Sequence, residues 1–114
     1  MIKIWHNNRC SKSREAKGIL EESSLEFEVF EYLKNSFTED DLRAIMTQLN
    51  ITDINEMLRT KEAEYKELDI ASKTQDEILS LVVQNPKLVE RPIIIKDGKA
   101  VIARPMENLT KLLG

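Results

Sequence analysis

The chain has 114 residues, a length that suits one compact domain, and it holds one cysteine (Cys10), one histidine (His6) and one tryptophan (Trp5). This count excludes a disulfide scaffold and a cysteine/histidine zinc site. The apolar runs are short and the N-terminus does not resemble a signal peptide, so we expect a cytoplasmic protein without membrane contact. Its thiol is then expected to be reduced. Seventeen basic against twenty acidic residues give a net charge of −3, which argues against nucleic-acid binding by the surface as a whole.

The first thirty residues predict a β-α-β unit. Ile2, Ile4 and Trp5 indicate one short strand, and the stretch 25–30 indicates a second, in which apolar and acidic residues alternate. Between them, residues 11–22 carry an apolar stripe at helical spacing. Such a unit normally pairs its two strands in parallel through a right-handed crossover.

The pattern changes to helices from Ser36 to Asn85. Thr38 and Thr74 are each followed three residues later by an acid, which is the sequence signature of a capping box, and helically spaced apolar residues follow both. Shorter helical segments are expected between these two helices. The apolar stripe of the first helix consists of Leu42, Ile45, Met46 and Leu49, and that of the second consists of Ile78, Leu79, Val82 and Val83. The apolar residues of the shorter segments are Ile54, Met57, Leu58 and Leu68.

The C-terminal part predicts a β-hairpin and a last helix. Strands over 92–96 and 99–103 flank Asp97-Gly98, a pair that favours a tight primed turn, and a helix is expected from about Pro105 to Leu113. Without the helical block of about 37–85, the order β-α-β then β-β-α resembles the thioredoxin/glutaredoxin fold, an α/β fold with a mixed sheet. We therefore expect one domain over 1–114 with a helical insertion.

Cys10 lies where the first strand passes into the first helix. At a helix N-terminus, free backbone amides favour an anion, and Arg9, Lys12, Arg14 and His6 can add positive charge nearby. Such surroundings lower a thiol pKa from about 8.5, and the same amides with the hydroxyls of two neighbouring serines could hold an oxyanion. The two serines are Ser11 and Ser13. The alternatives are that Cys10 is a buried structural residue, that the two serines only cap the helix, and that His6 makes a structural hydrogen bond.

A Cys-x-x-Cys motif would have its second cysteine at position 13, and this chain has Ser13 there. No second thiol is therefore available to resolve an adduct or a disulfide formed on Cys10. We expect a thiol from outside the chain to do so.

Two arginines precede prolines in similar contexts. Arg91 precedes Pro92 at the start of the third strand, and Arg104 precedes Pro105 after the fourth. In a thioredoxin-like layout the first of these prolines is typically cis and faces the cysteine loop, so both arginines are expected near the thiol. Joined by Arg59, they would form a clamp for a tetrahedral oxyanion. The alternative is that they are ordinary solvated surface residues.

Several ordered motifs together resemble the glutaredoxin-coupled arsenate reductase family, and in particular its short related members. The matching segments are His6-Asn7-x-x-Cys10-Ser11-Lys12-Ser13-Arg14, Leu58-Arg59, Tyr65-Lys66-Glu67-Leu68, Asn85-Pro86, Glu90-Arg91-Pro92-Ile93 and Ala103-Arg104-Pro105. The resemblance implies that Cys10 is the nucleophile and that Arg59, Arg91 and Arg104 bind the oxyanion. It also implies that His6 assists thiol ionisation and that Ser13 contacts the sulfur, and we expect Ser11 and Arg14 to assist in binding the substrate.

The expected reaction follows from this resemblance. The Cys10 thiolate attacks arsenate, glutathione attacks the adduct, and glutaredoxin completes the reduction so that arsenite is released. Glutathione is then a co-substrate, with no bound cofactor, and a monomer is sufficient. Two alternatives remain at this point: a non-enzymatic regulator that binds RNA polymerase, similar to the Spx proteins, which commonly carry Cys-x-x-Cys, and a glutathione-dependent oxidoreductase with another substrate.

Overall fold

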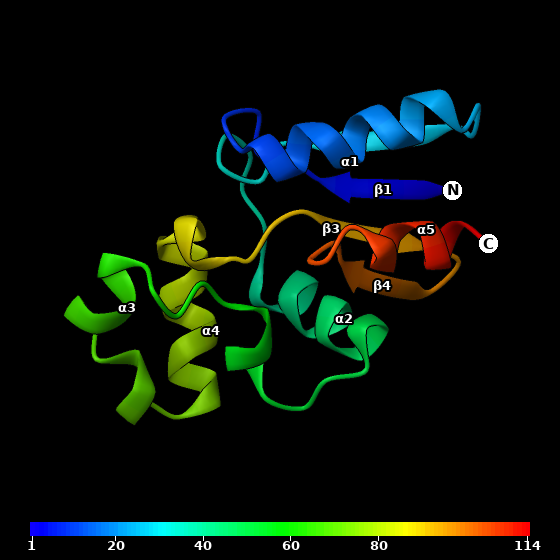
Figure 1. Cartoon of the computed structure of the whole chain (residues 1–114). Coiled ribbons are helices and arrows are strands. Elements are labelled where there is room, and N and C mark those ends of the chain that lie inside the picture. The colour runs from blue at the N-terminus through cyan, green and yellow to red at the C-terminus, as the bar shows by residue number, and fades with distance from the viewer. The chain divides into compact units, whose positions relative to one another are not determined.

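The computed structural model describes residues Met1–Gly114 and divides into two compact units (Figure 1). The first unit comprises 1–35 and 91–114, and the second comprises 36–90. The first contains the sheet, and the second is helical. No helix of the chain is both long enough and apolar enough to cross a bilayer.

The first unit is a four-stranded mixed sheet with two helices, as the sequence predicts. Its strands have the order β2-β1-β3-β4; β1 pairs with β2 in parallel and with β3 antiparallel, and β3 and β4 form an antiparallel hairpin. The elements are β1 (Ile2–Trp5), α1 (Ser11–Glu22), β2 (Phe27–Phe30), β3 (Ile93–Lys96), β4 (Lys99–Ile102) and α5 (Glu107–Leu113).

One apolar cluster joins both helices to the sheet. Ile4 of β1 is paired with Ile94 of β3, and both are fully buried together with Leu20 of α1 and Leu109 of α5. Burying a side chain of this size contributes roughly 1.5–3 kcal/mol. This packing holds the end of β1 and the start of α1, between which the cysteine loop runs.

The predicted hairpin turn is confirmed by its backbone. Asp97 has φ 50° and Gly98 has φ 79°, so both central residues adopt the positive φ that a type I′ turn requires. Glycine adopts this conformation without a steric penalty, and aspartate is among the few other residues that tolerate it. The pair thereby sets the register of β3 and β4.

Two predicted boundaries are wrong by two residues, and the two hairpin strands are each one residue shorter than predicted. The second strand begins at Phe27 instead of Leu25, because Ser24 has φ 62° and the chain is still turning there. The last helix begins at Glu107 instead of Pro105. Pro105 and Met106 form a preceding turn, in which their carbonyls accept from the backbone N–H groups of Asn108 and Leu109 at 3.0 Å each.

The helical unit follows the two predicted capping signals. In each capping box the threonine side chain accepts from a backbone N–H and the acid accepts from the threonine N–H: Thr38 with Asp41 begins α2, and Thr74 with Glu77 begins α4. The elements are α2 (Glu39–Leu49), the 3₁₀ turn Ile54–Met57, α3 (Ala63–Glu67), the 3₁₀ turn Ile70–Ser72, α4 (Gln75–Gln84) and the 3₁₀ turn Pro86–Leu88.

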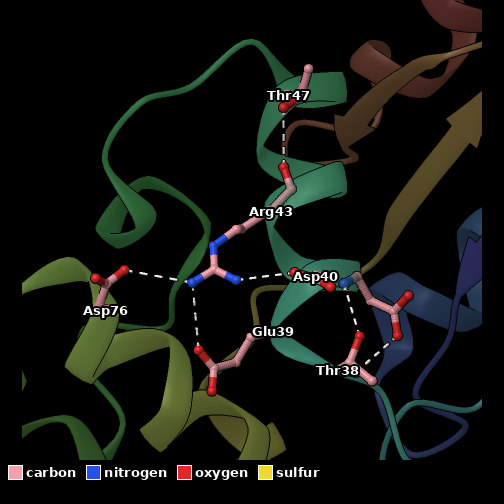
Figure 2. Close-up of polar contacts among 7 residues, drawn as sticks. Thr38, Glu39, Asp40, Arg43, Thr47 and Asp76 are labelled. Atoms are coloured by element: carbon pink, nitrogen blue, oxygen red, sulfur yellow. Dashed lines mark hydrogen bonds and ion pairs between the residues drawn. The ribbon is translucent and has the colours of Figure 1, made fainter.

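Arg43 joins the first turns of α2 and α4. Its guanidinium lies 3.1 Å from Asp40 and 3.6 Å from Glu39 on its own helix, and 3.5 Å from Asp76 of α4 (Figure 2). All four side chains are substantially exposed, so each pair contributes at most about 1 kcal/mol. The network links the two helices at the surface of the helical unit.

Candidate active site

The loop between β1 and α1 presents Cys10 as the N-cap residue of α1. Its backbone is extended, with φ −92° and ψ 122°. The Cys10 N–H donates to the Asn7 carbonyl at 3.0 Å, which closes a tight turn, and the Asn7 side chain accepts from the Arg9 N–H at 3.0 Å. The sulfur therefore lies where the free amides of the first turn can reach it. The side chain is nearly buried, at 8% exposure.

Ser13 and His6 connect the first turn of α1 to the end of β1. The Ser13 hydroxyl lies 2.6 Å from Nδ1 of His6 and accepts from the Asn7 N–H at 3.0 Å. Both side chains are buried. Burial is the main reason that the pKa of His6 is lowered. The imidazole is thus neutral at neutral pH and acts through its hydrogen bond instead of through a positive charge.

Two arginines that flank the β3–β4 hairpin approach the sulfur. Arg104 follows β4, and its Nη2 donates to the Cys10 sulfur at 3.6 Å while its Nε donates to the Arg91 carbonyl at 2.7 Å. Arg91 precedes β3, and the Arg91–Pro92 peptide bond is cis, as is the Arg104–Pro105 bond. The structure thereby brings Cys10, Arg91 and Arg104 together within the first unit.

The environment of Cys10 favours its ionised form. Burial is the largest single influence and raises the pKa of the thiol, but hydrogen bonds from the backbone N–H groups of Ser13 and Lys12 and the charge and hydrogen bonding of Arg91 lower it. These favourable contributions prevail, and the pKa of Cys10 lies below its ordinary value. A larger thiolate fraction at neutral pH makes the sulfur a better nucleophile.

The other residues singled out in the sequence have different surroundings. Arg14 is exposed and its Nη1 donates to the Asn8 carbonyl at 3.0 Å, so it stabilises the loop; Ser11 is the exposed first residue of α1. Arg59 belongs to the helical unit, where its N–H donates to the Leu88 carbonyl at 2.7 Å and its Nη1 pairs with Glu62 at 3.0 Å. Roles for Ser11, Arg14 and Arg59 toward a substrate stay predictions.

A cavity of about 480 Å³ lies beside the cysteine loop. Its walls come from the residues directly before Cys10 and from the segment after β2. The second segment was not singled out from the sequence, although the predicted parallel pairing of β1 and β2 brings the residues after both strands to the same end of the sheet. The lining residues are His6, Asn7, Asn8, Arg9, Glu31, Leu33 and Lys34. No group of three or more histidine, cysteine or acidic side chains in the chain could hold a metal ion.

Comparison with known proteins finds one family over nearly the whole chain. Residues 5–112 match the model of the ArsC family. The chain is 42% identical to YfgD, an uncharacterized protein of Escherichia coli K12, over 99% of this chain and 97% of that protein. It is 40% identical to the arsenate reductase of Neisseria meningitidis, over 98% and 97%. The solved arsenate reductase of Vibrio cholerae superimposes with a TM-score of 0.92 at 35% identity, covering 96% of this chain and 95% of that one.

Proposed function

Because the chain belongs to the ArsC family, we propose that it reduces arsenate to arsenite, with Cys10 as the nucleophile. The observation that carries this proposal is the Cys10 sulfur at a helix N-terminus, 3.6 Å from the guanidinium of Arg104. The backbone N–H of Ser13 and the charge of Arg91 lower the pKa of this thiol. Relatives 36–40% identical to this chain are named arsenate reductases. The reaction class and the site therefore agree.

The first step uses the thiolate and the two arginines. Arsenate is a tetrahedral anion, which planar guanidinium donors bind with paired hydrogen bonds. The Cys10 sulfur attacks arsenic, a sulfur–arsenic bond forms, and one arsenate oxygen leaves as water after protonation. Arg91 and Arg104 offset the negative charge that would otherwise keep thiolate and arsenate apart. Arg59, which the family resemblance implies as a further anion-binding residue, belongs to the helical unit, and its role toward arsenate stays a prediction.

The electrons come from thiols outside the chain. Arsenic remains in the +5 state in the first adduct, so its reduction needs two electrons that the single cysteine cannot supply alone. Two glutathione thiols provide them by forming one disulfide, with glutaredoxin as the thiol protein that completes the exchange. In sum, arsenate and two thiols give arsenite, one disulfide and water.

The cavity beside the loop supports glutathione as the co-substrate. Arg9 supplies a positive charge next to the residues that lead into Cys10, and Lys34 and Glu31 in the same lining form an ion pair at 3.3 Å. A carboxylate of glutathione can pair with Arg9, and its other charged groups can bind the Lys34–Glu31 pair. A thiol bound there would approach Cys10 within the same unit as the two arginines.

Arsenite formation tests the proposal directly. The purified protein is incubated with arsenate, glutathione and glutaredoxin, and arsenite is measured for the wild type and for Cys10→Ser. We expect turnover in the wild type, none in Cys10→Ser, and loss of turnover when glutathione is omitted. Absence of wild-type turnover would overturn the proposal, and wild-type reduction of a glutathione mixed disulfide in its place would assign another substrate to the same cysteine.

A further inference from the structure

Asn108 of α5 holds the backbone of the segment that carries Arg104. Its Nδ2 donates to the Ile102 carbonyl at 3.0 Å and to the Arg104 carbonyl at 3.5 Å. Asn108 is half-buried and does not contact the cysteine loop through these bonds. The two carbonyls that it binds enclose Ala103, directly after β4.

This segment is fixed from three directions. The Arg104 N–H donates to the same Ile102 carbonyl at 2.8 Å, so the chain reverses within three residues. The Ala103 N–H donates to the Pro92 carbonyl at 3.0 Å, and the Ala103 side chain is fully buried. Asn108 supplies the third constraint, from the helix side. The Cα of Arg104 is therefore held at a defined point relative to the segment that begins at Arg91.

The position of that Cα decides where the guanidinium can reach. The Arg104 side chain makes two contacts at once: its Nε donates to the Arg91 carbonyl at 2.7 Å, and its Nη2 donates to the Cys10 sulfur at 3.6 Å. An arginine side chain has several rotatable bonds, and a fixed backbone limits the entropy lost in holding one reaching conformation. A shift of about 1 Å at a reacting group can reduce a rate about a hundredfold.

We propose that Asn108 is a positioning residue that keeps the Arg104 guanidinium beside the Cys10 sulfur and therefore beside the bound oxyanion. Its side-chain amide has two N–H donors and therefore can bind the Ile102 and Arg104 carbonyls together. The part of the inference that concerns arsenate rests on the proposed function. The part that concerns the sulfur does not, because the reactivity of Cys10 can be measured without arsenate.

The test compares Asn108→Leu, which is close in size and has no donor, with Asn108→Ala and the control Thr110→Ala. Thr110 is exposed on the same helix, and its hydroxyl donates only within the helix, to the Glu107 carbonyl at 2.9 Å. The rate of Cys10 alkylation by iodoacetamide is measured against pH, which reports the thiolate fraction, and kcat and KM for arsenate are measured separately. Melting curves show that each variant is folded at the assay temperature.

We expect the alkylation profile of both Asn108 variants to move to higher pH and kcat/KM for arsenate to fall about tenfold or more, with Thr110→Ala unchanged. The same Asn108 substitutions in an Arg104→Ala background should add little further loss, because the group that they position is already gone. An unchanged alkylation profile in folded Asn108 variants would overturn the inference. So would a loss of equal size in the Arg104→Ala background. If the wild type did not reduce arsenate, the alkylation profiles would still decide between these outcomes.

Discussion

The reactivity of Cys10 is determined by the groups that contact its sulfur and not by the net charge of the chain. A protein with a charge of −3 nevertheless places two guanidinium groups and a helix N-terminus around one thiol. Burial opposes the thiolate, and the backbone N–H groups and Arg91 overcome that opposition. Residue type alone therefore does not activate the cysteine; its position at the start of α1 does.

His6 makes the stability of the fold depend on pH. Burial lowers its pKa in the folded chain, whereas in the unfolded chain the imidazole titrates near pH 6.5, at about its ordinary value. As the pH falls below about 6.5, the unfolded state binds a proton that the folded state does not, so the free energy of unfolding decreases. We expect urea midpoints to rise between about pH 5.5 and 7.5 in the wild type.

His6→Asn provides the comparison for that measurement. Asparagine retains a hydrogen-bonding group near the Ser13 hydroxyl but has no proton to gain in this pH range. The pH dependence of the urea midpoint should become shallower in this variant, whatever its absolute stability. A wild-type midpoint that stays level or falls over this range would contradict the assigned state of His6.

At the level of elements, α4 depends on its capping box. The Thr74 hydroxyl accepts from the Glu77 N–H at 3.3 Å, and the Glu77 carboxylate accepts from the Thr74 N–H at 2.9 Å. Thr74→Ala leaves the Glu77 N–H without its capping acceptor, so we expect a loss of about 1 kcal/mol in the free energy of unfolding, measured by chemical denaturation.

Thr47→Ala is the matched control. Thr47 is exposed near the C-terminal end of α2, and its hydroxyl donates back to the Arg43 carbonyl at 3.1 Å instead of capping a helix. Alanine favours helix more than threonine does, so this variant should be as stable as the wild type or slightly more stable. Equal losses in both variants would show that the cap itself contributes nothing.

Local signals in the sequence predicted most elements, and contacts between distant segments set the rest. The two threonine caps and the Asp97-Gly98 turn depend on residues within three or four positions of one another, and the structure has all three. The contacts of Arg104 with the Arg91 carbonyl and of Asn108 with the Ile102 carbonyl join segments through the folded backbone. Only their arrangement in space reveals them.

At the level of the whole molecule, the single cysteine determines what oxidation can produce. Cys10 is the only thiol, so no internal disulfide can form. We expect oxidised glutathione to convert the protein to a mixed disulfide at Cys10 that persists until an external thiol is added. Intact-mass spectrometry should show one added glutathione that remains after the excess is removed and disappears with a reduced thiol.

Cys10→Ser should gain no mass under the same conditions. Spontaneous loss of the adduct from the wild type, without any added thiol, would contradict the dependence on an external thiol. The adduct should persist because neither of the two units contains a second thiol that could displace glutathione from Cys10.

The most direct test of a thiolate in an oxyanion site is the titration of Cys10 by its absorbance near 240 nm, with and without phosphate, an unreactive tetrahedral anion like arsenate. The wild-type thiol should titrate below its ordinary value, because the backbone N–H groups of Ser13 and Lys12 and the charge of Arg91 lower its pKa, and phosphate should raise that pKa by placing negative charge beside the sulfur. Arg91→Ala should titrate at higher pH than the wild type and lose the phosphate effect. A wild-type thiol that titrates at its ordinary value and does not respond to phosphate would contradict the account.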